Sequence, residues 1–134
     1  MTAKVQIAEL ANRGDARGLS FSAPPEALAF VGRMSEVHLA STRPGAVRGN
    51  HYHLLRREAL VVMPGAKWSL HWDEGQHSPP QHREFSGASA VLVLISPGAS
   101  HAVRNDSDGK DELWLIAISS GPYDPSDTVM HKMT

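Results

Sequence analysis

Short segments in which apolar and polar residues alternate recur along the chain, and turn-forming residues separate them. Trp68–Trp72 places aromatic and aliphatic side chains on one face, and Val37–Ser41 alternates in the same way. This period of two is typical of half-buried β-strands. The apolar runs Ala59–Met63, Val91–Ile95 and Leu113–Ile118 have the length of buried strands. Weaker signals favour further strands through His51, over His101–Arg104, over Leu19–Phe21, and in an N-terminal arm or edge strand over residues 1–12.

Helical periodicity is nearly absent from the sequence. Glu26–Val31, which follows two prolines, has room for one short helical turn. The stretch Asp73–Gln81 and the tail from residue 121 to 134 are polar, so loops are expected there. About eight short strands with glycine, proline and aspartate turns favour an all-β sandwich or barrel. The double-stranded β-helix, or jelly roll, is one such architecture.

The composition narrows the class of protein. With 134 residues, the chain is expected to form a single domain over residues 1–134. The 13 basic and 14 acidic side chains nearly balance, so nothing favours nucleic acid or an anionic membrane as a partner. There is no cysteine, which excludes disulfides and cysteine-ligated zinc. The sequence shows neither a membrane-length apolar run nor a signal peptide, so a soluble cytoplasmic protein is expected.

Two segments carry side chains that suit a metal ion. His51 and His53 are two residues apart, so their imidazoles share one face of a strand. Glu58 opens the apolar run that follows, where a carboxylate is costly unless it is paired. His101 begins a short strand after a Pro-Gly turn, and three imidazoles with one carboxylate are a plausible ligand set for a divalent cation. His38 has apolar neighbours and is interpreted instead as a packed strand histidine.

The spacing of these residues resembles the two metal motifs of the cupin superfamily. The segment His51–Gly65 has the His-x-His, Glu and Gly of the first motif at the family's spacing. Gly98–Asn105 resembles the second motif in its Gly, His and Asn. The resemblance selects the jelly-roll barrel among the all-β folds, and it implies a homodimer in which residues 1–12 could cover a sheet edge of the partner. It also implies a set of metal ligands, namely His51, His53, Glu58 and His101.

A narrower resemblance within the cupins rests on Arg48–His53, which reads Arg-Gly-Asn-His-Tyr-His. This segment is similar to one in dTDP-4-dehydrorhamnose 3,5-epimerases, in dTDP-sugar 3,4-ketoisomerases and, most closely, in the C-terminal zinc cupin domain of capsule-polysaccharide reductase/epimerases. The segments Asp15–Gly18 and Tyr123–Thr128 are also similar to parts of these enzymes. The resemblance implies a role in polysaccharide biosynthesis, a small-molecule sugar substrate, and substrate binding by Arg48 and Arg17.

These enzymes act on keto sugars, which implies an isomerase or epimerase that works by enolisation. A base removes the proton next to the ketone, and the resulting enediolate must be stabilised. A zinc ion can serve as the Lewis acid, so zinc is the favoured metal, with iron, nickel and manganese as alternatives. A metal-bound histidine has no free lone pair, so His51 acts either as ligand or as base. If it is a ligand, His71 and Tyr123 are the candidate bases.

Other functions are compatible with the same ligand set. A polyketide cyclisation also begins with an enolate. An iron-dependent cupin dioxygenase would use the same three histidines and glutamate around a redox metal. A cupin that binds a small ligand without turnover is a further alternative. The identity of the metal separates the dioxygenase from the isomerase, and ligand binding without turnover would favour the non-catalytic protein.

Overall fold

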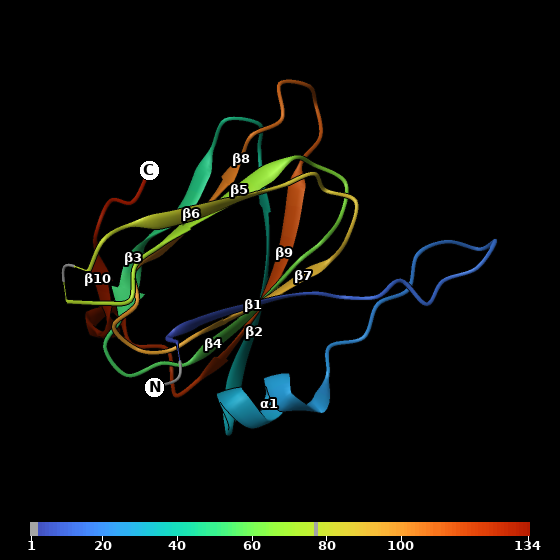
Figure 1. Cartoon of the computed structure of the whole chain (residues 1–134). Coiled ribbons are helices and arrows are strands. Elements are labelled where there is room, and N and C mark those ends of the chain that lie inside the picture. Colours follow the sequence, from blue (N-terminus) through green and yellow to red (C-terminus); the bar gives the residue numbers. More distant parts are fainter. Residues whose placement is uncertain (1–2, 77) are drawn as a thin grey trace.

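Two antiparallel β-sheets face each other in the computed structural model, which describes residues 3–76 and 78–134 (Figure 1). In spatial order, the first sheet contains β1 (Val5–Glu9), β7 (Val91–Ile95), β4 (Glu58–Val62), β9 (Leu113–Ser120) and β2 (Met34–Thr42). The second contains β10 (Thr128–Met130), β3 (Val47–His53), β8 (His101–Asn105), β5 (Trp68–Trp72) and β6 (Gln81–Phe85). Residues 1–2 of the expected arm and His77 of the expected loop lie outside the described residues.

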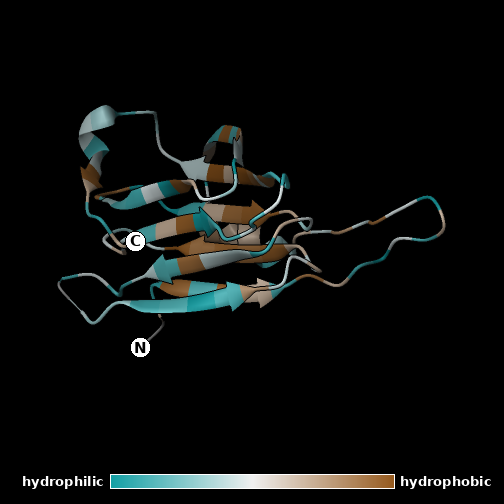
Figure 2. Cartoon of the chain, turned by 90° about the horizontal axis from the view of Figure 1, so that it is seen from above, coloured by the Kyte–Doolittle hydropathy of each residue, from teal (hydrophilic) through white to brown (hydrophobic). Residues whose placement is uncertain are grey.

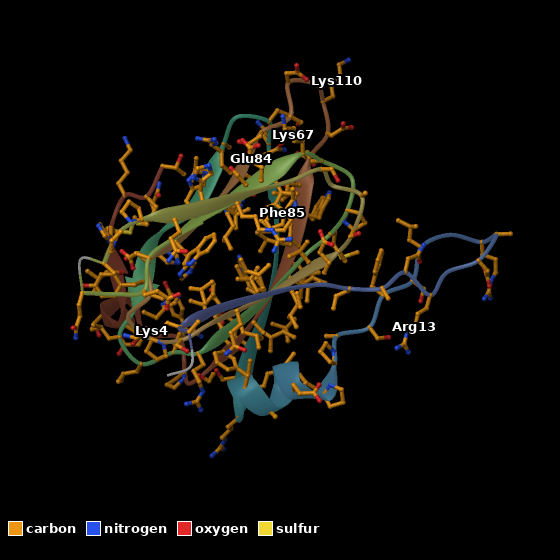
Figure 3. The ribbon with its side chains drawn as sticks, viewed as in Figure 1. Lys4, Arg13, Lys67, Glu84, Phe85 and Lys110 are labelled. Atoms are coloured by element: carbon orange, nitrogen blue, oxygen red, sulfur yellow. The ribbon has the colours of Figure 1, made fainter. Side chains whose placement is uncertain are left out.

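The hydrophobic core lies between the two sheets, because the strands of both sheets turn their apolar side chains inward. Trp68 and Leu70 on β5 are fully buried, and the Trp68 ring stacks on Phe85 of β6 with the centroids 4.2 Å apart. Figure 3 shows Phe85 in the interior and the neighbouring Glu84 turned outward. Burying each large apolar side chain contributes about 1.5–3 kcal/mol. The alternation predicted for β5 is therefore confirmed.

The outer face of the first sheet is partly covered by α1 (Pro25–Val31), the short helix expected after the prolines. Ala27 and Val31 pack against apolar side chains of β4 and β7. Between β1 and α1, a long loop projects away from the two sheets (Figures 1 and 2). The strand predicted over Leu19–Phe21 is wrong, because no strand among the described residues lies beside this loop to pair with it.

Two strands were not predicted from the sequence pattern. β6 is an edge strand whose first four residues are exposed, so it lacks the apolar alternation of a half-buried strand. The tail predicted to be a loop contains the 3-10 helix η1 (Pro125–Asp127) and β10. The three residues of β10 are too few to give a periodic pattern. The loop prediction is therefore wrong for residues 125–130.

The N-terminal strand covers a sheet edge within its own chain. β1 pairs with β7, with Val5 opposite Ile95, whereas the sequence suggested that it could cover an edge of a partner chain. The prediction of an all-β jelly-roll barrel is confirmed by the two facing antiparallel sheets. None of the helices among the described residues has the length and apolar character needed to cross a membrane.

Candidate functional site

Three histidines of the second sheet converge between the sheets. β3 carries His51 and His53, and β8 places His101 directly opposite His51. The ring centroids are 4.8 Å apart for His51 and His53, 4.9 Å for His51 and His101, and 5.8 Å for His53 and His101. One nitrogen of each ring lies within 4.8 Å of those of the other two. The three imidazoles can therefore reach one common ion.

Strand β3 is locally distorted where it enters this cluster. Asn50 has a positive φ of 55° and interrupts the regular register between Gly49 and His51. A β-bulge of this kind re-aims the side chains that follow it. Gly49 has a φ of 100°, and a Cβ there would lie 2.6 Å from the carbonyl oxygen of His101. The close approach of β3 and β8 therefore requires glycine at this position.

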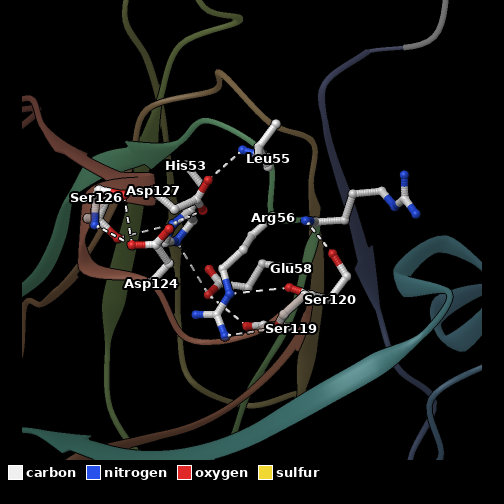
Figure 4. Close-up of polar contacts among 12 residues, drawn as sticks. His53, Leu55, Arg56, Glu58, Ser119, Ser120, Asp124, Ser126 and Asp127 are labelled. Carbon is white, nitrogen blue, oxygen red and sulfur yellow. Dashed lines mark hydrogen bonds and ion pairs between the residues drawn. The ribbon is translucent and has the colours of Figure 1, made fainter.

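Glu58 reaches the cluster from the first sheet, at the start of β4 (Figure 4). Its carboxylate is buried, with Oε1 3.4 Å from Nε2 of His101 and Oε2 3.7 Å from Nε2 of His53. The Ser119 hydroxyl donates to Oε2 at 3.3 Å. Burial alone would raise the pKa of Glu58, but the imidazoles of His101 and His53 outweigh it and hold this pKa well below its usual range. The carboxylate is therefore ionised at neutral pH.

The nitrogens that face Glu58 are available to a metal. Nδ1 of His101 is 3.0 Å from the carbonyl oxygen of Ala99, which places the proton on that nitrogen. Among the described residues, the buried Nε2 atoms of His53 and His101 have no hydrogen-bond partner. Burial, with a further contribution from His101 and His53, lowers the pKa of His51 to about 4, so this ring is neutral at neutral pH. Unpaired ring nitrogens beside a buried carboxylate fit a divalent metal ion.

A cavity of about 170 Å³ ends at this cluster. A cavity of about 150 Å³ can hold benzene, so this one suits a single sugar-sized ring, and a nucleotide would have to lie outside it. The Nε of Arg48 donates to the Ser41 carbonyl oxygen at 2.7 Å at the cavity wall. The other polar residues of the wall are His38, His51, Glu58 and His101. The apolar residues are Ala40, Leu60, Val103, Leu115 and Ala117.

Three of the predicted site residues lie elsewhere. His71 points from the outer face of β5 and stacks on His82 of β6, with the ring centroids 5.6 Å apart. Tyr123 is 72% exposed after β9, and the Arg17 side chain is 91% exposed on the projecting loop. Among the residues that the structure describes, none of these three lines the cavity. Arg48, by contrast, lines it together with predicted metal ligands.

Two residues beside the site were not assigned to it from the sequence. His38, interpreted as a packed strand histidine, lines the cavity from β2, on the same strand face as Ala40. The alternation of Val37–Ser41 carried this information, because residues two apart share a face. Asp127 of η1 is buried and lies 3.5 Å from Nδ1 of His53. The tail has no periodic signal that would have indicated its position.

Comparison with protein families gives a match over most of the chain. A family profile described as the polysaccharide biosynthesis C-terminal domain matches residues 15–129, a range that includes every predicted site residue. A comparison with curated protein sequences gave no match.

Solved structures of similar fold agree with the cupin expectation. Capsular polysaccharide assembling protein CapF from Staphylococcus aureus shares 24% identity and a TM-score of 0.65, over 92% of this chain and 34% of CapF. NovW, a 4-keto-6-deoxy sugar epimerase from Streptomyces spheroides, shares 24% identity and a TM-score of 0.74, over 93% of this chain and 67% of NovW. QdtA, a sugar 3,4-ketoisomerase from Thermoanaerobacterium thermosaccharolyticum, shares 15% identity and a TM-score of 0.68, over 96% of this chain and 89% of QdtA. The chain thus spans about a third of the length of CapF, and at these identities the likeness shows the cupin fold.

Proposed function

Because the chain belongs to the polysaccharide biosynthesis C-terminal domain family, we propose that its cavity is the active site of a metal-dependent isomerase or epimerase acting on a keto sugar. The observation that carries this proposal is the convergence of three imidazoles and an ionised, buried carboxylate at the end of a sugar-sized cavity. The similar folds support the substrate class, since NovW is a 4-keto-6-deoxy sugar epimerase and QdtA is a sugar 3,4-ketoisomerase.

The proposed metal ligands are the predicted ones, namely His51, His53, Glu58 and His101. When bound, the metal, with zinc favoured over iron, nickel and manganese, would polarise the ketone oxygen and make the adjacent C–H more acidic. Much of the cavity wall is apolar, and electrostatic interactions are stronger beside an apolar wall than in bulk water. Arg48 would bind an anionic phosphate of a sugar nucleotide near the cavity wall, because a guanidinium can donate two parallel hydrogen bonds to phosphate.

Proton transfer requires a group whose lone pair is not used by a metal. His51 and His101 line the cavity but belong to the ligand set, whereas His38 lines it from β2 of the other sheet. We therefore assign the proton transfer to His38. As the C–H bond next to the ketone breaks, its electron pair forms the enolate and the proton moves to the imidazole. Without a metal, His51 keeps its lone pair and takes this role instead.

Arg17 could reach a cavity only in a second copy of the chain. The loop that carries it projects from the two sheets (Figure 1), and its side chain is exposed while paired with Asp15 at 2.8 Å. We propose a homodimer in which this loop brings Arg17 to the cavity of the partner. Light scattering at micromolar concentration should give twice the 14.5 kDa mass of the chain. A monomeric mass would refute this assembly.

Elemental analysis of tag-free protein tests the metal site. The wild-type protein should carry nearly stoichiometric zinc or nickel, and His101→Ala and Glu58→Ala should lose it. His71→Ala, on the outer face of the same sheet, is the matched control and should keep the metal. Metal retained by both ligand variants, or no metal in protein grown with ample supply, would contradict the ligand set. Iron together with oxygen consumption would favour the dioxygenase.

Proton exchange tests enolisation separately. A 4-keto-6-deoxy sugar nucleotide incubated with the protein in D₂O should incorporate deuterium next to the ketone, seen by NMR as loss of the C–H signal. His38→Gln should slow this exchange by about 10²–10⁴-fold, the usual contribution of a general base, without changing the metal content. His82→Gln removes an exposed imidazole from β6 and should have no effect. Unchanged exchange in His38→Gln would overturn its assignment.

A further inference from the structure

Asp127 is a buried carboxylate that the chemistry proposed above does not use. It is 6% exposed at the end of η1, between the tail and β3 (Figure 4). Its Oδ1 accepts the N–H of Leu55 at 2.7 Å, and its backbone carbonyl accepts the N–H of Leu54 at 2.9 Å. Its Oδ2 has no hydrogen-bond partner among the described residues, and it lies 3.5 Å from Nδ1 of His53. A buried carboxylate oxygen is costly unless a proton donor faces it, and the His53 ring occupies that position.

The local structure of the tail holds this carboxylate in place. Asp124 caps the N-terminus of η1, and Pro125 suits the first helical position, which needs no backbone donor. The chain then pairs with β3 through β10, which places Thr128 directly opposite His53. The Thr128 hydroxyl lies 3.3 Å from Nδ1 of His53, on the same side of the ring as Asp127. Backbone pairing as well as side-chain contact therefore fixes the tail beside this ring.

His53 has a carboxylate beside each of its ring nitrogens. Asp127 is 3.5 Å from Nδ1, and Glu58 is 3.7 Å from Nε2. We propose that Asp127 keeps the proton of His53 on Nδ1, so that the Nε2 lone pair points at the metal position beside Glu58. This inference rests on the proposed metal site, and it makes Asp127 a positioning residue that acts through His53.

The opposite tautomer would work against metal binding. The Nδ1 lone pair would then face the Asp127 carboxylate, which is repulsive, and only the Thr128 hydroxyl could donate to it. The Nε2–H would point into the metal position. In metal sites generally, a carboxylate or carbonyl that accepts from the remote ring nitrogen fixes the tautomer and orientation of a ligating histidine. His101 already has such an acceptor in the Ala99 carbonyl oxygen, and Asp127 supplies the equivalent for His53.

Asp127→Asn tests the carboxylate while retaining the contact between tail and turn. The amide oxygen can still accept from Leu55, which turns the NH₂ donor toward Nδ1 of His53 and favours the opposite tautomer. Asp124→Asn is the matched control. It removes a second carboxylate of the tail, one that contacts Ser126, and asparagine still serves as a helix cap.

Nitrogen-15 NMR of the metal-free protein separates protonated from unprotonated ring nitrogens and needs neither metal nor substrate. At a pH where the ring is neutral, His53 should carry its proton on Nδ1 in the wild type and in Asp124→Asn. In Asp127→Asn the proton should move to Nε2. Zinc affinity, measured by competition with a chelator, should fall about 10–100-fold in Asp127→Asn and stay unchanged in Asp124→Asn.

Two results would overturn the proposal. The first is a wild-type His53 with its proton on Nε2. The second is an unchanged His53 tautomer in Asp127→Asn. This result would overturn the proposal if zinc affinity is retained. It would also do so if zinc affinity falls only together with faster hydrogen exchange at the Leu54 and Leu55 amides. Failure of the wild type to bind zinc would contradict the proposed metal site instead, and the NMR measurement would still decide the role of Asp127.

Discussion

His51 should make the metal-free protein lose stability in weak acid. Burial and the neighbouring histidines lower its pKa in the folded state from 6.5 to about 4. The unfolded chain therefore binds a proton more readily than the folded chain between these two pH values. The effect of His51 on stability is absent above about pH 6.5, and stability is lost as the pH falls toward 4.

The size of the loss follows from the two pKa values. They differ by about 2.5, which corresponds to about 3.4 kcal/mol when both states are fully protonated. At about pH 4.5, where the folded state is still mostly unprotonated, the linkage relation gives about 2.6 kcal/mol. His51 is only half-buried, so solvent screens its interactions and we expect half of that value, about 1.3 kcal/mol.

Urea denaturation in the presence of a chelator measures this loss. Wild type, His51→Gln and the control His82→Gln are compared at about pH 7 and about pH 4.5. Between these pH values, the wild type and His82→Gln should each lose about 1.3 kcal/mol more than His51→Gln. If His51→Gln loses as much stability as the wild type, the ring is not held neutral by its surroundings, and the physical reasoning about the cluster is wrong.

One further substitution tests the fold at the far end of β8, and another tests the cluster itself. Asn105→Ala should destabilise the fold by about 2–4 kcal/mol, because the buried amide donates to the carbonyl oxygens of Thr42 and Asp111, and chemical denaturation would show this. Gly49→Ala should weaken zinc binding in a chelator competition assay, because its Cβ would press β3 away from β8. Gly45→Ala is the matched control, since Gly45 also has a positive φ but nothing within 4 Å of a Cβ, and it should bind zinc normally.

The sequence pattern predicted the strands that have a buried face. Trp68–Trp72 and Val91–Ile95 match β5 and β7 at both ends, because their periodicity reflects the core that they build. The histidine cluster could be predicted for a different reason. The resemblance to the two cupin motifs implied that their histidines meet, and in the structure His51 and His101 are direct partners on adjacent antiparallel strands.

The direction in which a single side chain points was harder to predict from the sequence. The alternation placed His71 on the other face of its strand from Trp68 and Leu70. Only the burial of those two side chains shows that the face of His71 is the outer one. The strand β6 was missed because an exposed edge strand has no apolar face to give a period. Asp127 was missed because a short tail strand, and not any local pattern, carries it to His53.

The distances within the site depend on core packing as much as on the residues of the motifs. Glu58 belongs to the first sheet, and the three histidines belong to the second. No ladder of backbone hydrogen bonds pairs β4 with β3 or β8, the strands that carry the histidines, so the 3.4 Å between Glu58 and His101 is set by the side chains packed between the sheets. Leu60 and Val103 are among them, and both also line the cavity. Interiors are close-packed and transmit small changes in volume. The motif spacing could therefore single out the clustered residues, whereas their mutual geometry depends on contacts made by the whole barrel.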